Sequence, residues 1–445
     1  MTAIHLESPP GRAPSSRLRA RVLTSAFIGT TIEWYDFYLY GTAAALVFDT
    51  QFFPTHSAVA GTLGAFATFA VGFIARPVGG IIAGHLGDRI GRKAILVASL
   101  ILMGAASTAI GLLPTYESIG VLAVLGLVML RLLQGLACGA EWGGSALLSV
   151  EHAPRGLRGF FGSFTQVGSA AGMLLATGSF AIVQALTTPE QFQSVGWRVP
   201  FLASAMLVVL GIVIRSGISD APAFRVLREE ERVERAPLRT VLLHHRRALL
   251  ITIGLRLAQP ALFAILAIYL ISYLDLRRGD TTSGVTAVLI GSAVGLLSGP
   301  LWGAVSDRVG RKPLAVVSLL GIAVFVWPFF AFLDAGPLVA LPLVMILGMN
   351  VLHDAIYGPQ AAWFAEQFPV HVRYTGVSVG CQIGTVLSGG LTPVIAASLL
   401  LAGNGTPWLT CLYLTALCGL SLAAALAAED PARDPRTVDH FEETR

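Results

Sequence analysis

Charged residues are scarce in this chain. Of its 445 residues, 13% are Asp, Glu, Lys or Arg and 54% are hydrophobic, and the mean hydropathy is +0.72. An ordinary soluble domain carries about 25% charged residues. Apolar runs of roughly 20 residues, the length that a helix needs to cross a bilayer core about 30 Å thick, recur along the sequence. We therefore predict an all-α polytopic membrane protein.

Cysteine and the motifs of several other protein classes are also rare or missing. The four cysteines (Cys138, Cys381, Cys411 and Cys418) all fall within apolar stretches, which argues against a disulfide framework. The sequence has no G-x-x-x-x-G-K phosphate loop, no H-E-x-x-H and no paired-cysteine metal motif. A membrane enzyme, the alternative from another class, would need a nucleophile–base pair that we do not find. We expect no enzymatic activity, no metal and no cofactor. The net charge of +4 is not interpreted as a sign of nucleic-acid binding.

Twelve apolar segments are long enough to be transmembrane helices. They lie near 22–48, 59–83, 94–112, 120–149, 160–186, 199–216, 249–274, 285–304, 314–333, 338–364, 374–401 and 407–428. The polar stretch before residue 20 lacks the pattern of a removable signal peptide. The expected organisation is a tail (1–20), a six-helix bundle (21–216), a linker (217–248), a second six-helix bundle (249–428) and a tail (429–445).

The distribution of arginine and lysine predicts the orientation. On one side of the membrane, the predicted loops hold only Arg198, Arg277 and Arg278 as basic residues. The other side holds nearly all the rest, so the positive-inside rule places it, with both chain ends, in the cytoplasm. The linker contains the charge run RVLREEERVERAPLR, which we interpret as a solvated connector of helical composition. We expect a multi-pass protein of the cell (inner or plasma) membrane.

One charged, glycine-rich phrase occurs twice. GHLGDRIGRK (84–93) is closely matched by GAVSDRVGRK (303–312), and each copy joins the second and third predicted spans of its half, which indicates an internal duplication. Glycine permits tight turns and close helix approach, and an aspartate at the membrane edge favours a helix N-terminus or an arginine. The phrase is either a topogenic anchor or a gate that stabilises one access state. Its candidate gate residues are Gly84, Asp88, Arg89, Gly91, Arg92, Lys93, Gly303, Asp307, Arg308, Gly310, Arg311 and Lys312.

Seven formal charges lie inside the predicted spans. They are Glu33, Asp36, Arg76, Arg131, Glu141, Arg256 and Asp354. Each costs about 3 kcal/mol at the bilayer centre on insertion scales, or roughly 20 kcal/mol together if all faced lipid. That exceeds the net stability of most folds, about 5–15 kcal/mol. The charges must therefore face a wet cavity or one another.

Depth along the helices suggests ion pairs. Arg76 and Glu141 lie at a similar depth in the first half and are expected to pair, as are Arg256 and Asp354 in the second half. Four carboxylates against three arginines leave one acid without a cation. A desolvated carboxylate without a cation is suited to carry a proton. The alternative is a purely structural network of ion pairs.

Proton coupling is expected in the first half. Glu33 and Asp36 lie three residues apart on one face of the first span, and Arg131 in the fourth span reaches a similar depth. We expect either acid to carry the proton. A guanidinium can bind a carboxylate through two parallel hydrogen bonds. Arg131 therefore either responds to the protonation state of these acids, which we favour, or binds an anionic substrate. Gln134 shares its helix face and is a further candidate for substrate binding.

Substrate contacts are expected near the middle of both halves. Asn350, His353, Asp354 and Tyr357 form one polar stripe on an apolar helix, as expected of a cavity lining. Arg256 and Gln259, just before Pro260, would face this stripe. Of the aromatic residues around the acids of the first span, we expect Tyr40 to contact substrate. Glycines repeat every fourth residue in the fifth, eighth and eleventh spans, as in either static or sliding helix contacts.

Several stretches resemble one known family. GHLGDRIGRK is similar to the loop motif of the major facilitator superfamily. GTTIEWYDFYLYG (29–41), ARPVGG (75–80), RLLQGLACGAEWGGSALLSVEHAP (131–154) and GWRVPF (196–201) resemble its metabolite:proton symporters, which include shikimate, citrate, α-ketoglutarate and proline/betaine carriers. The resemblance covers residues 20–428 and is greatest to the shikimate carriers. It implies two six-helix bundles around a central cavity, alternating access, and a proton-coupling role for the arginine in RLLQG.

We therefore expect a proton-coupled symporter that imports a small organic acid such as shikimate. Its expected partners are the metabolite, protons and the lipid bilayer, without nucleic acid, and it is expected to work as a monomer. The alternative is uptake of a zwitterionic osmolyte such as proline or betaine. Osmosensing relatives add a long coiled-coil tail, whereas EDPARDPRTVDHFEETR has no heptads.

Overall fold

The computed structural model describes residues 16–53, 58–154, 156–216, 234 and 236–431. Within these ranges the chain is almost entirely helical and contains no strand. Twelve long helical segments account for all twelve predicted spans, so the predicted fold class is confirmed. Ten of them, among the described residues, are long and apolar enough on composition alone to cross a membrane. Most of the predicted linker, including the greater part of its charge run, lies outside the described residues.

The first half contains six long, continuous helices. They are α1 (Ser16–Leu46), α3 (Ala58–Ile90), α4 (Arg92–Leu112), α6 (Val121–Glu151), α7 (Arg158–Leu186) and α9 (Arg198–Ser216). Three short helices lie between them, α2 (Phe48–Gln51), α5 (Tyr116–Ile119) and α8 (Pro189–Gln191). Most of the long helices extend a few residues beyond the apolar stretches, because a helix continues after its chain has left the hydrocarbon.

The second half has the same order, but three of its helical segments are broken. The seventh span comprises α12 (Arg246–Leu255), α13 (Ala258–Ala264), a π-helical turn η2 (Ile265–Tyr269) and α14 (Leu270–Arg278). The tenth comprises α17 (Leu341–Met345), η4 (Ile346–His353) and α18 (Asp354–Glu366), and the eleventh α19 (Arg373–Thr385), η6 (Val386–Gly390) and α20 (Thr392–Ala402). The continuous helices are α15 (Thr281–Val309), α16 (Arg311–Ala335) and α21 (Trp408–Ala427), and α11 (Pro237–His244) precedes α12.

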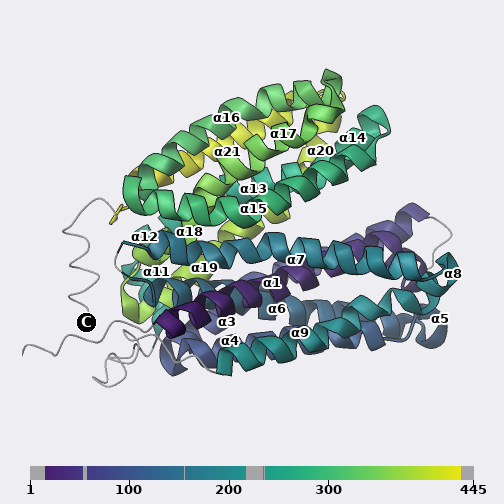
Figure 1. Cartoon of the computed structure of the whole chain (residues 1–445), viewed down its shortest axis with the longest axis horizontal. Helices are drawn as coiled ribbons and strands as arrows, with labels where there is room; N and C mark the ends of the chain where they lie inside the picture. The colour runs from purple at the N-terminus through teal and green to yellow at the C-terminus, as the bar shows by residue number, and fades with distance from the viewer. Residues whose placement is uncertain (1–15, 54–57, 155, 217–233, 235, 432–445) are drawn as a thin grey trace, which may run out of the picture.

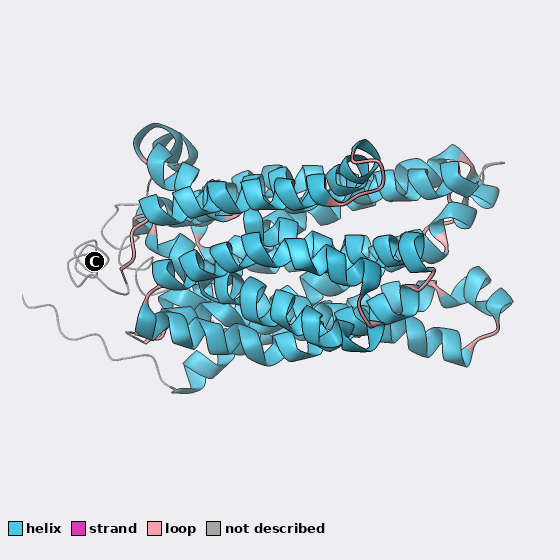
Figure 2. Cartoon of the chain, turned by 90° about the horizontal axis from the view of Figure 1, so that it is seen from above, coloured by secondary structure: helices cyan, strands magenta, loops and turns pink. Residues whose placement is uncertain are grey.

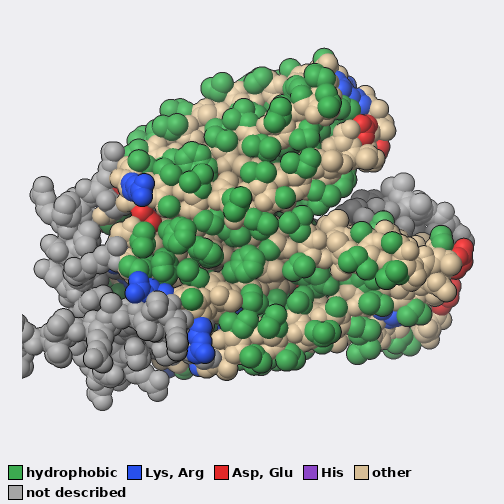
Figure 3. Space-filling view, viewed as in Figure 1, with side chains coloured by type: hydrophobic (Ala, Val, Ile, Leu, Met, Phe, Trp, Pro, Cys, Tyr) green, Lys and Arg blue, Asp and Glu red, His purple; other side chains and the backbone are tan. Residues whose placement is uncertain are grey.

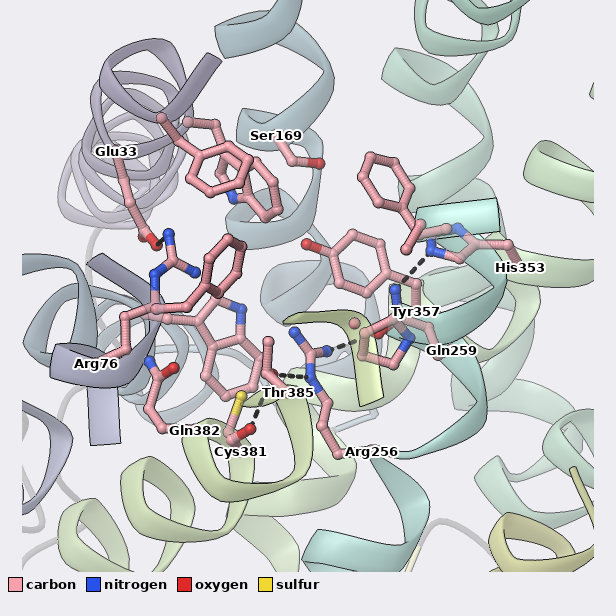
Figure 4. Close-up of a pocket in the computed structure, with 18 of the residues that line it drawn as sticks. Glu33, Arg76, Ser169, Arg256, Gln259, His353, Tyr357, Cys381, Gln382 and Thr385 are labelled. Atoms are coloured by element: carbon pink, nitrogen blue, oxygen red, sulfur yellow. Dashed lines mark hydrogen bonds and ion pairs between the residues drawn. The ribbon is translucent and has the colours of Figure 1, made fainter. Parts of the chain in front are cut away.

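The break between α12 and α13 follows from Pro260. Proline has no N–H to donate to the carbonyl four residues before it, which is the carbonyl of Arg256. Ser388 Oγ donates to that carbonyl instead (3.3 Å). The helix therefore opens at Arg256, whose side chain lies among the residues drawn in Figure 4. π-helical turns are frequent at functional sites, and η2, η4 and η6 lie on the three spans that carry the polar residues of this half.

The two halves form two bundles that meet at one end and separate at the other (Figure 1). The view from above shows the long helices running side by side along the same axis (Figure 2). Helix α7 packs on α15 and α18, and α3 packs on α19. We call the end where the halves meet the closed end; it holds the turns between α3 and α4 and between α15 and α16. The opposite end is called the open end.

The surface agrees with a bilayer environment. On the face shown in Figure 3, hydrophobic side chains cover the sides of both bundles, and charged side chains gather at the two ends. Large apolar side chains such as Leu112, Met206 and Leu297 are exposed along the helices (67%, 77% and 77%). In water this would be an unusually large apolar surface, whereas in lipid it carries no penalty.

Candidate functional site

A cavity lies between the two halves and is lined by both. Its empty space is about 710 Å³, including the part open to solvent. That size is suited to a small metabolite. The polar lining consists of Glu33, Arg76, Ser169, Arg256, Gln259, His353, Tyr357, Gln382 and Thr385 (Figure 4). The apolar lining is mainly aromatic and includes Trp34, Phe37, Phe73, Trp142 and Phe263.

Arg76 lies beside Glu33 in this cavity, and not beside Glu141 as the sequence predicted. The Arg76 guanidinium is 3.7 Å from Glu33 Oε1, at the distance of an ion pair but beyond a hydrogen bond. Its carbon lies 5.2 Å and 5.1 Å from the ring centroids of Phe37 and Phe73. The predicted Arg76–Glu141 pair is therefore wrong, because similar depth on two helices does not place side chains on facing sides.

Glu141 is instead held by Arg215, which lies near the end of the predicted sixth span (199–216) but was left out of the seven predicted charges. Arg215 Nη1 donates to Glu141 Oε2 (3.0 Å), and Nη2 contacts Oε1. Ser145 (2.7 Å) and Ser99 (3.1 Å) also donate to this carboxylate. Arg215 is the penultimate residue of α9, yet its long side chain extends back into the bundle past Gly29, where even a Cβ would meet it. Counting Arg215, the acids inside the spans no longer outnumber the arginines.

Asp36 and Arg131 form a separate buried cluster inside the first half. Ser204 Oγ donates to Asp36 Oδ1 (2.9 Å), while Asp36 Oδ2 is buried without a hydrogen bond. Arg131 lies close enough to interact electrostatically with Asp36. It donates to Gln134 Oε1 (3.1 Å) and lies over the Tyr40 ring, 4.2 Å from its centroid.

This cluster lies behind the cavity wall. Arg131, Gln134 and Tyr40, which were predicted to bind substrate, are not part of the lining. Phe37 is the aromatic residue between the two sites, because it lines the cavity and lies near both Arg76 and Arg131 (5.2 Å and 5.9 Å from the ring centroid). The geometry therefore suits these three residues to a role near Asp36 more than to direct contact with substrate.

Arg256 reaches the cavity from the break in the seventh span. Its Nε donates to Thr385 Oγ1 (3.0 Å), and Nη1 donates to Gln259 Oε1 (2.8 Å) and to the side-chain oxygen of Gln360. The guanidinium also lies near the rings of Trp142 and Tyr357, at 5.2 Å and 5.7 Å from their centroids. All of these acceptors are neutral, and Arg256 forms no ion pair with an acid within the described part of the chain.

The predicted pair of Arg256 and Asp354 is wrong, because the side chains of Gln259 and His353 lie between them. Gln259 Nε2 is 2.5 Å from His353 Nε2, and His353 Nδ1 is 2.8 Å from Asp354 Oδ1. Asp354 Oδ2 accepts from Ser298 Oγ and from Asn350 Nδ2, the latter at 3.1 Å. The result is one hydrogen-bonded chain from Arg256 to Asp354.

The predicted polar stripe borders two cavities. His353 and Tyr357 line both the central cavity and a smaller one. Asn350 and Asp354 line only the smaller one, together with Tyr38 of α1 and the glycines of α15. Hydrophobic periodicity could place the four residues on one face, but it could not show which of them faces which space.

Two equivalent contacts join the halves at the closed end. Asp88 Oδ1 and Oδ2 accept from the backbone N–H groups of Tyr374 (3.2 Å) and Thr375 (2.9 Å), in the first turn of α19. Asp307 accepts from the N–H groups of Gly159 (2.8 Å) and Phe160 (2.9 Å), in the first turn of α7. Each aspartate thus caps a helix of the opposite half, where exposed N–H groups and the helix dipole favour a negative charge. We call these two contacts the latches.

The glycines of the repeated phrase allow the latches to form. Gly91 and Gly310 have φ angles of 106° and 95°, which favour glycine. A Cβ on Gly84 would lie 2.6 Å from Thr375 Cα, and one on Gly303 would lie 2.6 Å from the carbonyl oxygen of Gly159. Both pairs join opposite halves, so the backbones of the crossing helices are in contact at these positions.

The basic residues of the phrase act mainly within their own halves. Arg92 pairs with Glu151 at the end of α6, and Arg311 pairs with Glu366 at the end of α18 (3.0 Å). Lys93 Nζ donates to the carbonyl of Ser216, the last residue of α9 (3.0 Å), and Lys312 Nζ donates to that of Leu426 near the end of α21 (3.1 Å). Arg89 and Arg308 are exposed.

Several of these partners were not predicted from the sequence. Glu151 also pairs with Arg373 of the opposite half (3.1 Å). A second internal repeat could have indicated them, because E-x-x-P-x-x-x-R occurs at 151–158 and again at 366–373. Gln360 and Thr385, the other partners of Arg256, had no such signal.

Twelve apolar helices in two equivalent bundles, with a polar cavity between them and latches at one end, define a membrane transporter. Residues 26–380 match the family described as the Major Facilitator Superfamily, and the chain belongs to that family. It is 40% identical over 440 residues to the shikimate transporter of Escherichia coli, covering 97% of this chain and 99% of that protein. It is also 39% identical over 421 residues to an inner membrane metabolite transport protein of the same species (93% and 94% covered). The chain is therefore a multi-pass membrane transporter and not an enzyme.

Other relatives are named for different substrates. The chain is 29% identical over 425 residues to the proline/betaine transporter of Salmonella typhimurium, covering 93% of this chain and 84% of that protein. Among solved structures, the proton:xylose symporter XylE bound to 6-bromo-6-deoxy-D-glucose is similar in fold (TM-score 0.76, 18% identity, 93% and 95% covered). The inward open conformation of XylE from E. coli matches less well (TM-score 0.62, 17% identity, 96% and 99% covered).

Proposed function

We propose that this protein takes up a small organic acid together with protons, by alternating access of the central cavity to the two sides of the membrane. The carboxylate of the substrate binds Arg256, and its ring or carbon skeleton packs on the aromatic lining. The similarity to the shikimate transporter supports a small hydroxy-carboxylate of this kind.

The charge of the cavity is the observation that carries this proposal. Its lining contains one acid, Glu33, and two arginines, Arg76 and Arg256, so it has one net positive charge when Glu33 is ionised and His353 is neutral. Arg256 forms no ion pair with any carboxylate among the described residues, and its Nη2 donates to none of them. A guanidinium in a largely apolar cavity is stabilised strongly by an anion that accepts two parallel hydrogen bonds.

The same lining disfavours a quaternary ammonium substrate. Betaine-like ligands are held over the faces of aromatic rings. Four of the lining rings, those of Phe37, Phe73, Trp142 and Tyr357, already lie close to an arginine guanidinium. A second cation in the same place would be repelled. Uptake of a zwitterion is therefore the second candidate, and the relationship to proline/betaine transporters is its only support.

Proton coupling is proposed for the buried cluster of Asp36, Arg131 and Gln134. Asp36 is 2% exposed and lies in a region where a bare carboxylate loses most of its hydration. A carboxylate in such a place is stabilised either by a nearby cation or by taking up a proton. We propose that Arg131 and a proton alternate in this role as the halves move.

The latches are proposed to be the gate. With both latches formed, the halves are joined at one end and the two bundles are separated at the other (Figure 3). The cavity is proposed to open at the separated end. The proposed orientation places the closed end, which carries the basic residues of the repeated phrases, in the cytoplasm. The structure then corresponds to the outward-facing state of an inner-membrane importer.

Uptake into proteoliposomes tests the proposal. The purified protein would be given shikimate, citrate, α-ketoglutarate, proline and betaine, with an acidic exterior and with or without a protonophore. We expect accumulation of an organic acid that stops with the protonophore, and a loss of at least roughly tenfold in its affinity in Arg256→Gln, as for a lost charged hydrogen bond. Accumulation of betaine or proline alone would contradict the proposed substrate class. Arg277→Gln, at the open end and outside the cavity, is the matched control.

A further inference from the structure

The side-chain amide of Gln259 has a fixed orientation. Arg256 can only donate hydrogen bonds, and its Nη1 lies 2.8 Å from one end of this amide. That end must be the oxygen, so the NH₂ group faces His353 Nε2 at 2.5 Å. His353 Nε2 must then accept, and the proton of the neutral ring lies on Nδ1, from which it is donated to Asp354 Oδ1 (2.8 Å). The hydrogen bonds that link Arg256, Gln259, His353 and Asp354 therefore all donate in one direction, from the arginine towards the aspartate.

This arrangement opposes protonation of His353. A second ring proton would lie on Nε2 and point at the NH₂ group of Gln259, so that two donors would meet. Rotation of the amide would relieve that clash, but it would turn the NH₂ group towards the Arg256 guanidinium, which is again a donor. As long as Arg256 holds Gln259, His353 is kept neutral in spite of its contact with Asp354.

A carboxylate on Arg256 would remove this restraint. Once a substrate carboxylate accepts from Nη1 as well as Nη2, Gln259 loses its donor and is free to turn its oxygen to His353 Nε2. A protonated His353 would then donate to Gln259 at one nitrogen and to the Asp354 carboxylate at the other. The proton would come from a hydronium ion in the cavity that His353 lines: one of its O–H bonds would break, the Nε2–H bond of the ring would form, and a water molecule would be left.

We infer that Gln259 is a positioning residue that makes protonation of His353 conditional on occupation of Arg256 by the substrate carboxylate. This inference rests on the proposed function, since it requires an anionic substrate at Arg256. It adds a second proton-binding position, in the second half of the chain and apart from Asp36. Because linkage is reciprocal, the proton and the substrate would each strengthen the binding of the other.

Other ionisable groups share the surroundings of His353. In the two cavities that it lines, the charged or titratable side chains are Glu33, Tyr38, Arg76, Arg256, Asp354, Tyr357 and Cys381. Among the described contacts of the His353 ring, only Asp354 and Gln259 are hydrogen-bond partners, and Phe263 and Tyr357 contribute ring contacts at 5.6 Å and 5.0 Å. Gln259 is therefore the direct link from the ring to a permanent cation.

Proton uptake on substrate binding tests the inference. Purified protein in weakly buffered detergent solution would be mixed with shikimate, citrate or α-ketoglutarate, with a pH indicator for protons and calorimetry for binding. The Asp36→Asn background removes the coupling proposed for the first half. In it we expect up to about one proton taken up per carboxylate bound, and a severalfold smaller uptake after a further Gln259→Met or His353→Gln exchange.

The variants separate the possible results. Gln259→Met preserves the side-chain volume, and Gln367→Ala, at the end of α18 near the closed end, is the control that should leave proton uptake unchanged. Gln259→Glu should bind a proton before substrate arrives and show no uptake on binding. Substrate binding with the same proton uptake in Gln259→Met as in its parent would overturn the inference and leave the proposed function standing. Failure of all three acids to bind the wild-type protein would overturn both.

Discussion

Asp36 is the residue on which proton coupling depends in the proposed mechanism. Asp36→Asn fixes the side chain in a neutral, proton-loaded form while Ser204 can still donate to its oxygen. We expect this variant to exchange labelled substrate across the membrane but to lose accumulation against a gradient. Counterflow and pH-driven uptake in proteoliposomes measure the two activities separately. Full accumulation by Asp36→Asn would exclude the role, whereas loss of both activities would indicate a structural one.

Glu141 and Arg215 are expected to be structural. Glu141 is fully buried and bonded to Arg215, Ser145 and Ser99, and it does not line the cavity. Arg215→Met leaves an uncompensated buried carboxylate, which typically costs about 3–5 kcal/mol. The double variant Arg215→Met/Glu141→Gln should recover most of that loss. Thermal unfolding in detergent is the measurement, and equal stability of the single and double variants would contradict this assignment.

At the scale of single residues, the sequence predicted which charged side chains are buried better than it predicted their ion-pair partners. All seven charges predicted inside the spans are 7% exposed or less, although only three of them line the central cavity. The pairings could not be predicted, because depth along a helix gives no direction around its axis. The long side chain of Arg215 also reaches the interior from a position at the helix end.

Among the helices, α7 and α15 share the most extensive contact between the halves. A Cβ on Gly159 would lie 2.5 Å from both the carbonyl oxygen of Gly303 and Ser306 Oγ. Gly159→Ala retains the N–H that donates to Asp307 but should keep the two helices apart. We expect a severalfold lower uptake rate with little loss of folding, because the contact is between halves and not within one.

Gly178→Ala is the matched control for that substitution. It lies in the same helix, and its Cβ would meet nothing within 4 Å. Alanine in a helix interior is more stable than glycine by roughly 0.5–1 kcal/mol, so this variant should transport normally and unfold at the same or a higher temperature. A normal uptake rate in Gly159→Ala would show that the close crossing is not required for closure.

The element scale also shows what hydropathy can and cannot predict. The twelve spans follow from apolar length, because the bilayer requires it. The breaks at η2, η4 and η6 were not predicted, because a π-helical turn changes hydrogen bonding without changing the apolar pattern. Pro260, just before η2, and Pro393, just after η6, were available signs of irregular helix, and only Pro260 was used, to place Arg256 and Gln259.

On the scale of the whole molecule, the duplication explains why the gate is symmetric. Each half contributes one aspartate, on α3 or α15, and one helix N-terminus, of α7 or α19, to the other half. The sequence predicted an aspartate at the membrane edge near a helix N-terminus, but not that the helix belongs to the opposite bundle. Hydropathy and repeats describe each half separately, and contacts between the halves arise only when they are packed together.

Both latches stabilise the state that is closed at this end, so their removal should favour the opposite state. A negative charge at a helix N-terminus contributes about 0.3–1 kcal/mol, and up to about 2 kcal/mol when partly buried. Asp88→Asn/Asp307→Asn together should therefore shift the equilibrium by about 1–4 kcal/mol, roughly fivefold to several hundredfold. Each single variant should give an intermediate shift, because the two contacts lie on separate helices.

Spin labels at Arg89 and Arg308 would measure this shift. Both positions are exposed, lie beside the latches and belong to opposite halves, and the four native cysteines are buried. In the labelled protein we expect one main distance between the two spin labels. In the double Asn variant we expect a second, longer distance, whose population increases while that of the first decreases. Asp334→Asn, at the open end, removes a carboxylate that pairs with Arg277 and should leave the distances unchanged. An unchanged distribution in the double Asn variant would mean that the aspartates anchor the chain in the membrane without controlling access.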